Sequence, residues 1–206
     1  MCAIEHKDHV KSRSFIQHNG YHVCYAGVNC GLYSGVILIV KDTLQPMVVQ
    51  SDIHGQYIVV EINYEGQRIW IVGIYAPNEV SQCIELWQRL NEVLSNGYPG
   101  FLLGDFNMCS KVGQSTSMHS LMDAPKRAIW DLFAIEVLKY DAWLWINGTD
   151  YGYTFQSTQF RSTWSRLDRI YIMWFLPEVL IMQVYRGIVR PISNYLGMHT
   201  SRGGWF

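Results

Sequence analysis

Apolar residues in this chain gather mainly in short runs, a pattern typical of buried β-strands rather than of long helices. We interpret five of these runs as strands: residues 36–40, 59–62, 69–74, 101–103 and 170–172. The second and third runs flank the polar segment 63–67, which contains Gly66, so they predict a hairpin. Thr154-Phe155 predicts a further short strand, and residues 165–172 extend the last run into a longer one.

Two segments instead show helical spacing. The first is predicted to begin at Ser81, as the N-cap residue, and to end at Ser95, with apolar positions at Ile84, Trp87, Leu90 and Leu94. The second covers residues 126–138. Many strands with few helices between them favour an α+β layered sandwich, in which two sheets face each other and the first helix packs outside.

Composition indicates one domain with a sizeable core. The 206 residues are 49% hydrophobic and only 16% charged, and the net charge is -1. No strong overall attraction for nucleic acid is therefore expected. After Asp150, however, every basic residue is an arginine, the side chain best suited to phosphate contacts. Arg161, Arg166 and Arg169 are candidate nucleic-acid contacts, with scattered solvated arginines as the alternative.

The cysteines and the hydropathy pattern predict an intracellular protein, in the nucleus or cytoplasm, and not a secreted one. The 5 cysteines have no Cys-x-x-Cys spacing, which favours reduced thiols over disulfides or a zinc site. The first residues lack an apolar segment of signal-peptide length. The most apolar window, residues 170–189, contains Pro177, Glu178, Gln183 and Arg186, so we expect buried strands there and no membrane span.

The segment Gly104-Asp105-Phe106-Asn107 carries the strongest chemical signal. It ends a short apolar run that begins after Pro99-Gly100, as a buried central strand does. Side chains two residues apart on a strand point the same way, so a carboxylate and an amide would enter one cleft together. The carboxylate suits a base or a hard-metal ligand. The alternative is a turn, since Gly, Asp and Asn are common turn residues.

Six motifs in a fixed order carry a resemblance to a known family. They are Ala3-Ile4-Glu5-His6-Lys7, Tyr33-Ser34-Gly35-Val36, Ile74-Tyr75-Ala76-Pro77-Asn78, Gly104-Asp105-Phe106-Asn107, Tyr153-Thr154-Phe155 and Ser165-Arg166-Leu167-Asp168-Arg169-Ile170. The series resembles the endonuclease/exonuclease/phosphatase superfamily, and most of all the apurinic-type endonuclease domain of plant LINE-like retrotransposons. The resemblance covers nearly the whole chain. It implies a four-layer α/β/β/α sandwich of two facing mixed sheets with outer helices.

The resemblance also implies roles for single residues in phosphodiester hydrolysis. Glu5 matches the Mg²⁺ carboxylate, where Mn²⁺ can substitute, and the alternative is a solvated Glu. Tyr75 matches the hydroxyl that reaches the phosphate or the metal, and the alternative is a core aromatic. Asp105 matches the carboxylate that orients or deprotonates the attacking water, and Asn107 the amide that holds the phosphate. Asp168 matches the carboxylate that orients a catalytic histidine, and the alternative is a buried Asp paired with Arg166 or Arg169.

Two departures from the family pattern predict reduced or lost activity. The closing Ser-Asp-His motif reads Ser193-Asn194-Tyr195 here, so Asn194 and Tyr195 occupy the positions of an Asp and of the catalytic His. The family also begins with a strand that bears an Asn well before the Glu, and only four residues precede Glu5. We therefore expect a single domain over residues 1–206 that lacks the first strand and is truncated at both ends.

Three functions remain open from the sequence. The first is a Mg²⁺-dependent DNA endonuclease domain of retroelement origin, monomeric and originally fused to a reverse transcriptase, that is now partly or wholly a pseudoenzyme. The second is a catalytically dead nucleic-acid-binding remnant that relies on the three arginines. The third is a phosphatase of the same superfamily, for which the Ser-Arg-Leu-Asp-Arg context gives no support.

Overall fold

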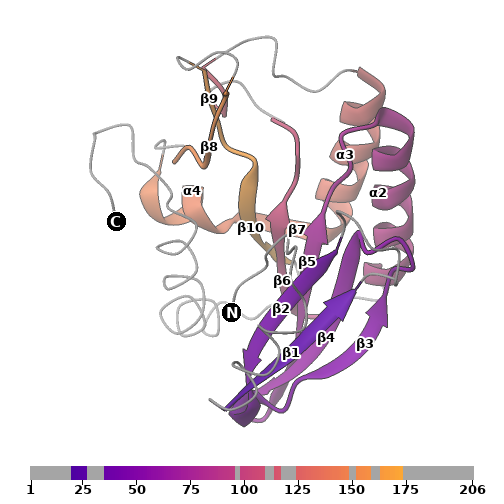
Figure 1. Ribbon diagram of the computed structural model, residues 1–206, viewed down its shortest axis with the longest axis vertical. Coiled ribbons are helices and arrows are strands. Elements are labelled where there is room, and N and C mark those ends of the chain that lie inside the picture. The colour runs from indigo at the N-terminus through magenta and orange to yellow at the C-terminus, as the bar shows by residue number, and fades with distance from the viewer. Residues whose placement is uncertain are drawn as a thin grey trace.

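The computed structural model describes residues 20–26, 35–95, 98–109, 114–116, 124–148, 152–158 and 163–173. These residues form stacked layers (Figure 1). Two long helices, α2 (Val80–Leu94) and α3 (Ala124–Val137), pack together and cover one face of a six-stranded sheet. A hairpin of β1 (Tyr21–Ala26) and β2 (Val36–Lys41) packs on the other face. The predicted α+β sandwich class is confirmed, and the described residues build three of its layers.

The six-stranded sheet is mixed. Its order is β3 (Met47–Ser51), β4 (Tyr57–Tyr64), β5 (Gln67–Tyr75), β6 (Gly100–Asp105), β10 (Asp168–Met173) and β7 (Leu138–Asp141). Only β5 and β6 pair in parallel, because α2 connects them in a βαβ crossover. The predicted hairpin is β4 and β5, which pair from Tyr57 opposite Ile74 to Tyr64 opposite Gln67.

Alternating residues on the central strands supply two separate cores. On β5, Ile69 and Ile71 belong to the core between the two sheets, whereas Trp70 and Val72 belong to the core under the helices. Both sets are buried, so β4, β5 and β6 are apolar on both faces. This explains why their sequences form continuous apolar runs instead of alternating patterns.

The helix boundaries differ slightly from the prediction. The N-cap of α2 is Glu79 and not Ser81, because the Glu79 carboxylate accepts hydrogen bonds from the backbone N–H groups of Ser81 and Gln82. The second predicted helix ends at Val137, and Leu138 begins β7. No helix in the described part of the chain has both the length and the apolar character needed to cross a membrane.

Three smaller elements complete the described residues. They are a 3-10 turn η1 (Asp42–Leu44), the short helix α4 (Ala142–Asn147) after β7, and a two-stranded ribbon of β8 (Phe155–Gln156) and β9 (Trp164–Ser165). In Figure 1 this ribbon stands beyond the end of β10, in the chain segment that leads into that strand.

Candidate functional site

Three of the residues singled out in the sequence lie in one row across neighbouring strands. Tyr75, the last residue of β5, is opposite Asp105, the last residue of β6, and Asp105 is opposite Asp168, the first residue of β10. All three side chains are half-buried. A tyrosine and two carboxylates therefore meet at one end of three neighbouring strands. They come from segments up to 93 positions apart in the numbering (168 minus 75).

The row lies on the face of the sheet that points toward the β1–β2 hairpin. Leu103 lies two positions before Asp105, and Ile170 lies two positions after Asp168. Both belong to the core between the sheets. Because strand side chains alternate, the two carboxylates point to that same face. Tyr75 packs against the same core. The site therefore forms where the inter-sheet core ends.

Asn107 joins this row through a turn and not through strand alternation. Its φ of 46° is left-handed, so the strand does not continue to it. Its backbone N–H donates to Asp105 Oδ1 at 2.8 Å, and its Nδ2 donates to the Ala76 carbonyl at 2.7 Å. The backbone N–H of Asn107 thus fixes the Asp105 carboxylate, and its side-chain amide ties the end of β6 to the end of β5. Asx-type turns of this kind suit Asn and Asp.

The turn is anchored in the helix-side core and to the segment that precedes β10. Phe106 is fully buried in the helix-side core, where its ring stacks on Trp87 at 5.8 Å between centroids. Its backbone N–H donates to the Leu167 carbonyl at 2.9 Å. Gly104 is required just before it, because its φ is 142° and a Cβ there would lie 2.0 Å from the Ile74 carbonyl oxygen. Only glycine can bring Asp105 this close to β5.

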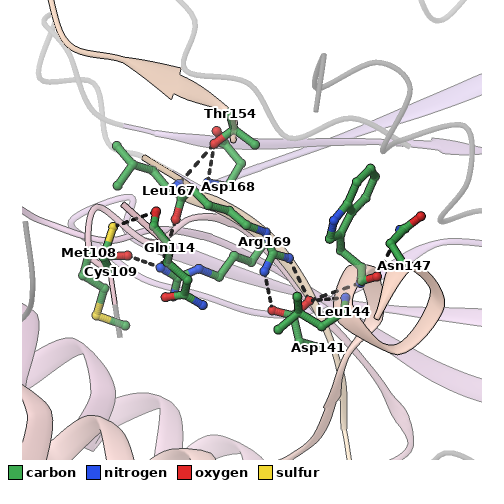
Figure 2. A network of polar contacts seen from close by, with 12 residues as sticks. Met108, Cys109, Gln114, Asp141, Leu144, Asn147, Thr154, Leu167, Asp168 and Arg169 are labelled. Atoms are coloured by element: carbon green, nitrogen blue, oxygen red, sulfur yellow. Dashed lines mark hydrogen bonds and ion pairs between the residues drawn. The ribbon is translucent and has the colours of Figure 1, made fainter. Parts of the chain in front are cut away.

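Asp168 is held by Thr154, a residue for which no role was predicted. Thr154 Oγ1 accepts the backbone N–H groups of Leu167 and Asp168, each at 3.1 Å (Figure 2). Burial raises the pKa of the Asp168 carboxyl above its ordinary value, while the Thr154 hydroxyl and the nearby Arg169 act to lower it. The Tyr153-Thr154-Phe155 motif was visible in the sequence, but this contact depends on folding and was not.

Arg166 and Arg169 do not lie on the surface, contrary to the expectation that they contact nucleic acid. Both are fully buried. Arg166 forms a bidentate ion pair with Asp141: its Nη1 and Nη2 donate to the two carboxylate oxygens, each at 2.7 Å. Asp141 also caps α4 by accepting the N–H groups of Trp143 and Leu144. Arg166 therefore pairs with Asp141, and the charges of Arg169 and Arg166 act on Asp168 by lowering the pKa of its carboxyl.

Arg169 is engaged inside the protein too. Its Nη2 donates to the Met108 carbonyl and, at 3.0 Å, to the Arg166 carbonyl (Figure 2 shows the Met108 contact). Its guanidinium carbon lies 5.4 Å from the centroid of the Phe106 ring. The other predicted site residues, Glu5, Arg161, Asn194 and Tyr195, lie outside the described residues.

The described residues supply part of the donor set that Mg²⁺ prefers. That ion takes oxygen ligands, keeps several waters and needs only one or two carboxylates from the protein. The half-buried Asp105 carboxylate fits such a set. No group of three or more His, Cys, Asp or Glu side chains that could hold a metal gathers within the described ranges. Glu5 is the metal carboxylate that the sequence predicts, and it lies outside the described residues.

Solved structures with the same architecture identify the fold. The chain has the fold of the endonuclease/exonuclease/phosphatase superfamily. An AP endonuclease from Archaeoglobus fulgidus matches with a TM-score of 0.64 and 17% identity, over 82% of this chain and 72% of that chain. The catalytic domain of Xenopus laevis APE2 matches with a TM-score of 0.58 and 15% identity, over 82% and 72%.

A retrotransposon protein is among these structures. The endonuclease domain of TRAS1, a telomere-specific non-LTR retrotransposon, matches with a TM-score of 0.53 and 18% identity, over 76% of this chain and 68% of that chain. No family model matches the sequence, and no curated protein matches it. At these identities the likeness establishes the fold, and the structural neighbours named here are nucleases.

Proposed function

We propose that this chain is a DNA endonuclease domain of retroelement origin, a Mg²⁺-dependent phosphodiester hydrolase whose activity is reduced or lost. The observation that carries the proposal is the row of Tyr75, Asp105 and Asp168, with Asn107 bound to Asp105 beside it. The motif order and the likeness to TRAS1 support the retroelement origin. The proposal includes a monomeric, intracellular domain, located in the nucleus or cytoplasm. It also includes an original fusion to a reverse transcriptase.

The chemistry of each residue type suits hydrolysis of a phosphodiester. A half-buried carboxylate at Asp105 can orient a water molecule or take its proton. The Asn107 amide and the Tyr75 hydroxyl are neutral donors that can contact phosphate oxygens, where negative charge develops. Glu5 would hold Mg²⁺ or Mn²⁺, which supplies positive charge to the reacting phosphate and supports the leaving oxygen when it is bound.

The closing motif is the reason we propose reduced catalysis. Asn194 and Tyr195 stand where the superfamily pattern has an Asp and a His. An amide cannot replace the charge of a carboxylate, and a phenol does not exchange a proton near neutral pH as an imidazole does. Loss of one general acid–base group typically lowers a rate by about 10²–10⁴-fold.

A binding-only function has less support from the described residues. It relied on Arg161, Arg166 and Arg169, and the last two are fully buried and bonded to the protein's own groups. A headgroup phosphatase gains no specific observation either. The nuclease proposal therefore takes precedence over both.

Nicking of supercoiled plasmid tests the proposal. We expect the natural chain to nick weakly in Mg²⁺ or Mn²⁺. The double variant Asn194→Asp/Tyr195→His, extended by a family-type first strand that carries its Asn, should nick roughly 10²-fold faster, the lower end expected for a restored acid–base group. Each single variant should gain little, because residues that act as one unit are not additive. Asp105→Ala in the double variant should abolish nicking, and EDTA should do the same.

Other outcomes would point elsewhere. Strong nicking by the natural chain that is insensitive to replacement of Tyr195 would show that the closing motif is wrongly assigned. DNA binding in a mobility-shift assay, with no nicking by the double variant, would favour the binding remnant. Release of phosphate from a soluble inositol phosphate would favour the phosphatase.

A further inference from the structure

Arg169 is a buried charge that forms no ion pair with a carboxylate among the described residues, although it lowers the pKa of the nearby Asp168. Its side chain is fully buried, and the ion pairs of the described residues join other arginines to Glu61, Asp52 and Asp141. Burying an unpaired charge is costly, and buried arginines normally pair with a carboxylate as Arg166 does with Asp141. An apolar side chain at position 169 would fill the same space at lower cost. The presence of a charged guanidinium at this buried position therefore needs a separate explanation.

The guanidinium of Arg169 bridges the two segments that carry the catalytic carboxylates. It donates to the carbonyl of Met108, which closes the turn after Asp105, and to the carbonyl of Arg166, which precedes Asp168. It also packs over Phe106, the residue between Asp105 and Asn107. One side chain thus contacts the turn at Phe106 and Met108, with Asn107 between them.

Arg169 acts from the face opposite the site. It follows Asp168 on β10, so it points toward the helices, and Tyr171 two positions later belongs to the helix-side core. Its strand partner is Gly104, the residue that precedes Asp105. The guanidinium therefore lies under the turn, where substrate at the carboxylate row does not reach it.

We propose that Arg169 is a positioning residue for Asp105 and Asn107. Its guanidinium donates to both the Met108 carbonyl and the Arg166 carbonyl, and so fixes the turn over residues 106–108. The fixed turn sets the direction of the Asp105 carboxylate and the Asn107 amide. The link from this geometry to hydrolysis rests on the proposed nuclease function. The geometric part does not, which allows the two to be tested separately.

Amide hydrogen exchange measured by NMR on the full chain tests the geometry. In Arg169→Met, the N–H groups of Phe106 and Asn107 should exchange about tenfold faster, since hydrogen bonds from a charged donor are lost. The N–H groups of Val60 and Ile71, in the central strands, should keep their rates. Arg169→Lys, which retains a charged donor, should recover part of the protection.

Arg166→Met is the matched control, because Arg166 is an equally buried arginine three residues away. It should speed exchange at Trp143 and Leu144, which the Asp141 carboxylate caps, and leave Phe106 and Asn107 unchanged. Unchanged protection at Phe106 and Asn107 in Arg169→Met would overturn the proposal. So would a loss shared equally by Val60 and Ile71, with no recovery in Arg169→Lys, because that pattern is general destabilisation.

A kinetic arm connects the geometry to the reaction. In the Asn194→Asp/Tyr195→His background, Arg169→Met should lower kcat for nicking about tenfold with little change in KM, and Arg169→Lys should restore part of kcat. A rise in KM with unchanged kcat would contradict positioning. If the background variant itself does not nick, the nuclease proposal fails, and the exchange measurements still decide whether Arg169 holds the turn.

Discussion

The carboxyl group of Asp168 is held in surroundings that disfavour its charge. Burial raises the pKa of this group, and the opposing effects of Thr154 and Arg169 are smaller. A carboxyl whose pKa is higher in the folded state than in the unfolded chain binds its proton more tightly when folded. Its favourable contribution to stability is therefore complete below the unfolded pKa and is lost as the pH rises through the folded pKa.

Replacing Asp168 with Asn should accordingly stabilise the protein at neutral pH. We expect Asp168→Asn to raise the free energy of unfolding at pH 7 and to leave it nearly unchanged at about pH 3, below the ordinary pKa of Asp, where the natural carboxyl is protonated in both states. Urea denaturation at the two pH values measures this difference. Asp131→Asn, at an exposed position of α3, is the control and should change stability little at either pH. A variant less stable at pH 7 would show that Thr154 and Arg169 outweigh burial.

Individual site residues were predictable where a strand end marked them. Asp105 and Asp168 stand at the boundaries of apolar runs, and Tyr75 ends another, so the sequence itself shows that each of them leaves the core at the end of a strand. Thr154 and Asp141 act through contacts with residues 14 and 25 positions away, which no local pattern records. Arg166 and Arg169 were expected to contact nucleic acid because arginine suits phosphate contacts, and their buried partners appear only in the folded chain.

At the scale of elements, Asp141 joins three parts of the structure. It ends β7, caps α4 and pairs with the buried Arg166 in the segment before β10. Asp141→Ala should lower the free energy of unfolding by about 3–5 kcal/mol, because it leaves a buried guanidinium without its partner. Chemical denaturation measures the loss.

A double variant separates the ion pair from the cap. Asp141→Ala/Arg166→Met removes the stranded charge and should recover a large part of the lost stability, leaving a deficit of about 1 kcal/mol from the missing cap. A loss below about 1 kcal/mol in the single variant would mean that the pair behaves like an exposed one. No recovery in the double variant would instead assign the loss to the cap and the packing.

Elements marked by an apolar run or by helical spacing were predictable, and the others were not. The five predicted strands and the helix α2 occur within a few residues of their expected bounds. β3 was not predicted, since it is exposed along its whole length at the sheet edge and shows no alternation. The register that aligns Tyr75, Asp105 and Asp168 was not predictable either. It depends on the parallel pairing of β5 with β6 and on the bonds of the turn at Asn107.

At the scale of the whole molecule, one sheet supports two cores. Its central strands contribute Ile58 and Ile71 to the core against the β1–β2 hairpin, and Val59 and Val72 to the core under α2 and α3. Figure 1 shows the hairpin and the two helices on opposite faces of this sheet. Loss of either layer therefore exposes one face of strands whose other face packs on the remaining layer. Because both layers depend on the same strands, they should unfold together.

Truncations in the two cores test this coupling. Leu38→Ala in β2 and Leu90→Ala in α2 each remove a fully buried side chain, so each should cost about 2–5 kcal/mol, whereas Leu132→Ala, at a 59% exposed position of α3, should cost little. The two buried changes share no contact and should add within about 0.5 kcal/mol. Urea unfolding should give one coincident transition in every variant when it is followed by tryptophan fluorescence and by far-UV circular dichroism. Trp87 contributes to the fluorescence from the helix-side core.

An early transition in Leu38→Ala that circular dichroism detects and fluorescence does not would show that the β1–β2 hairpin unfolds by itself. In that case the carboxylate row, which lies on the hairpin side of the sheet, could lose its cover without the rest of the fold being lost.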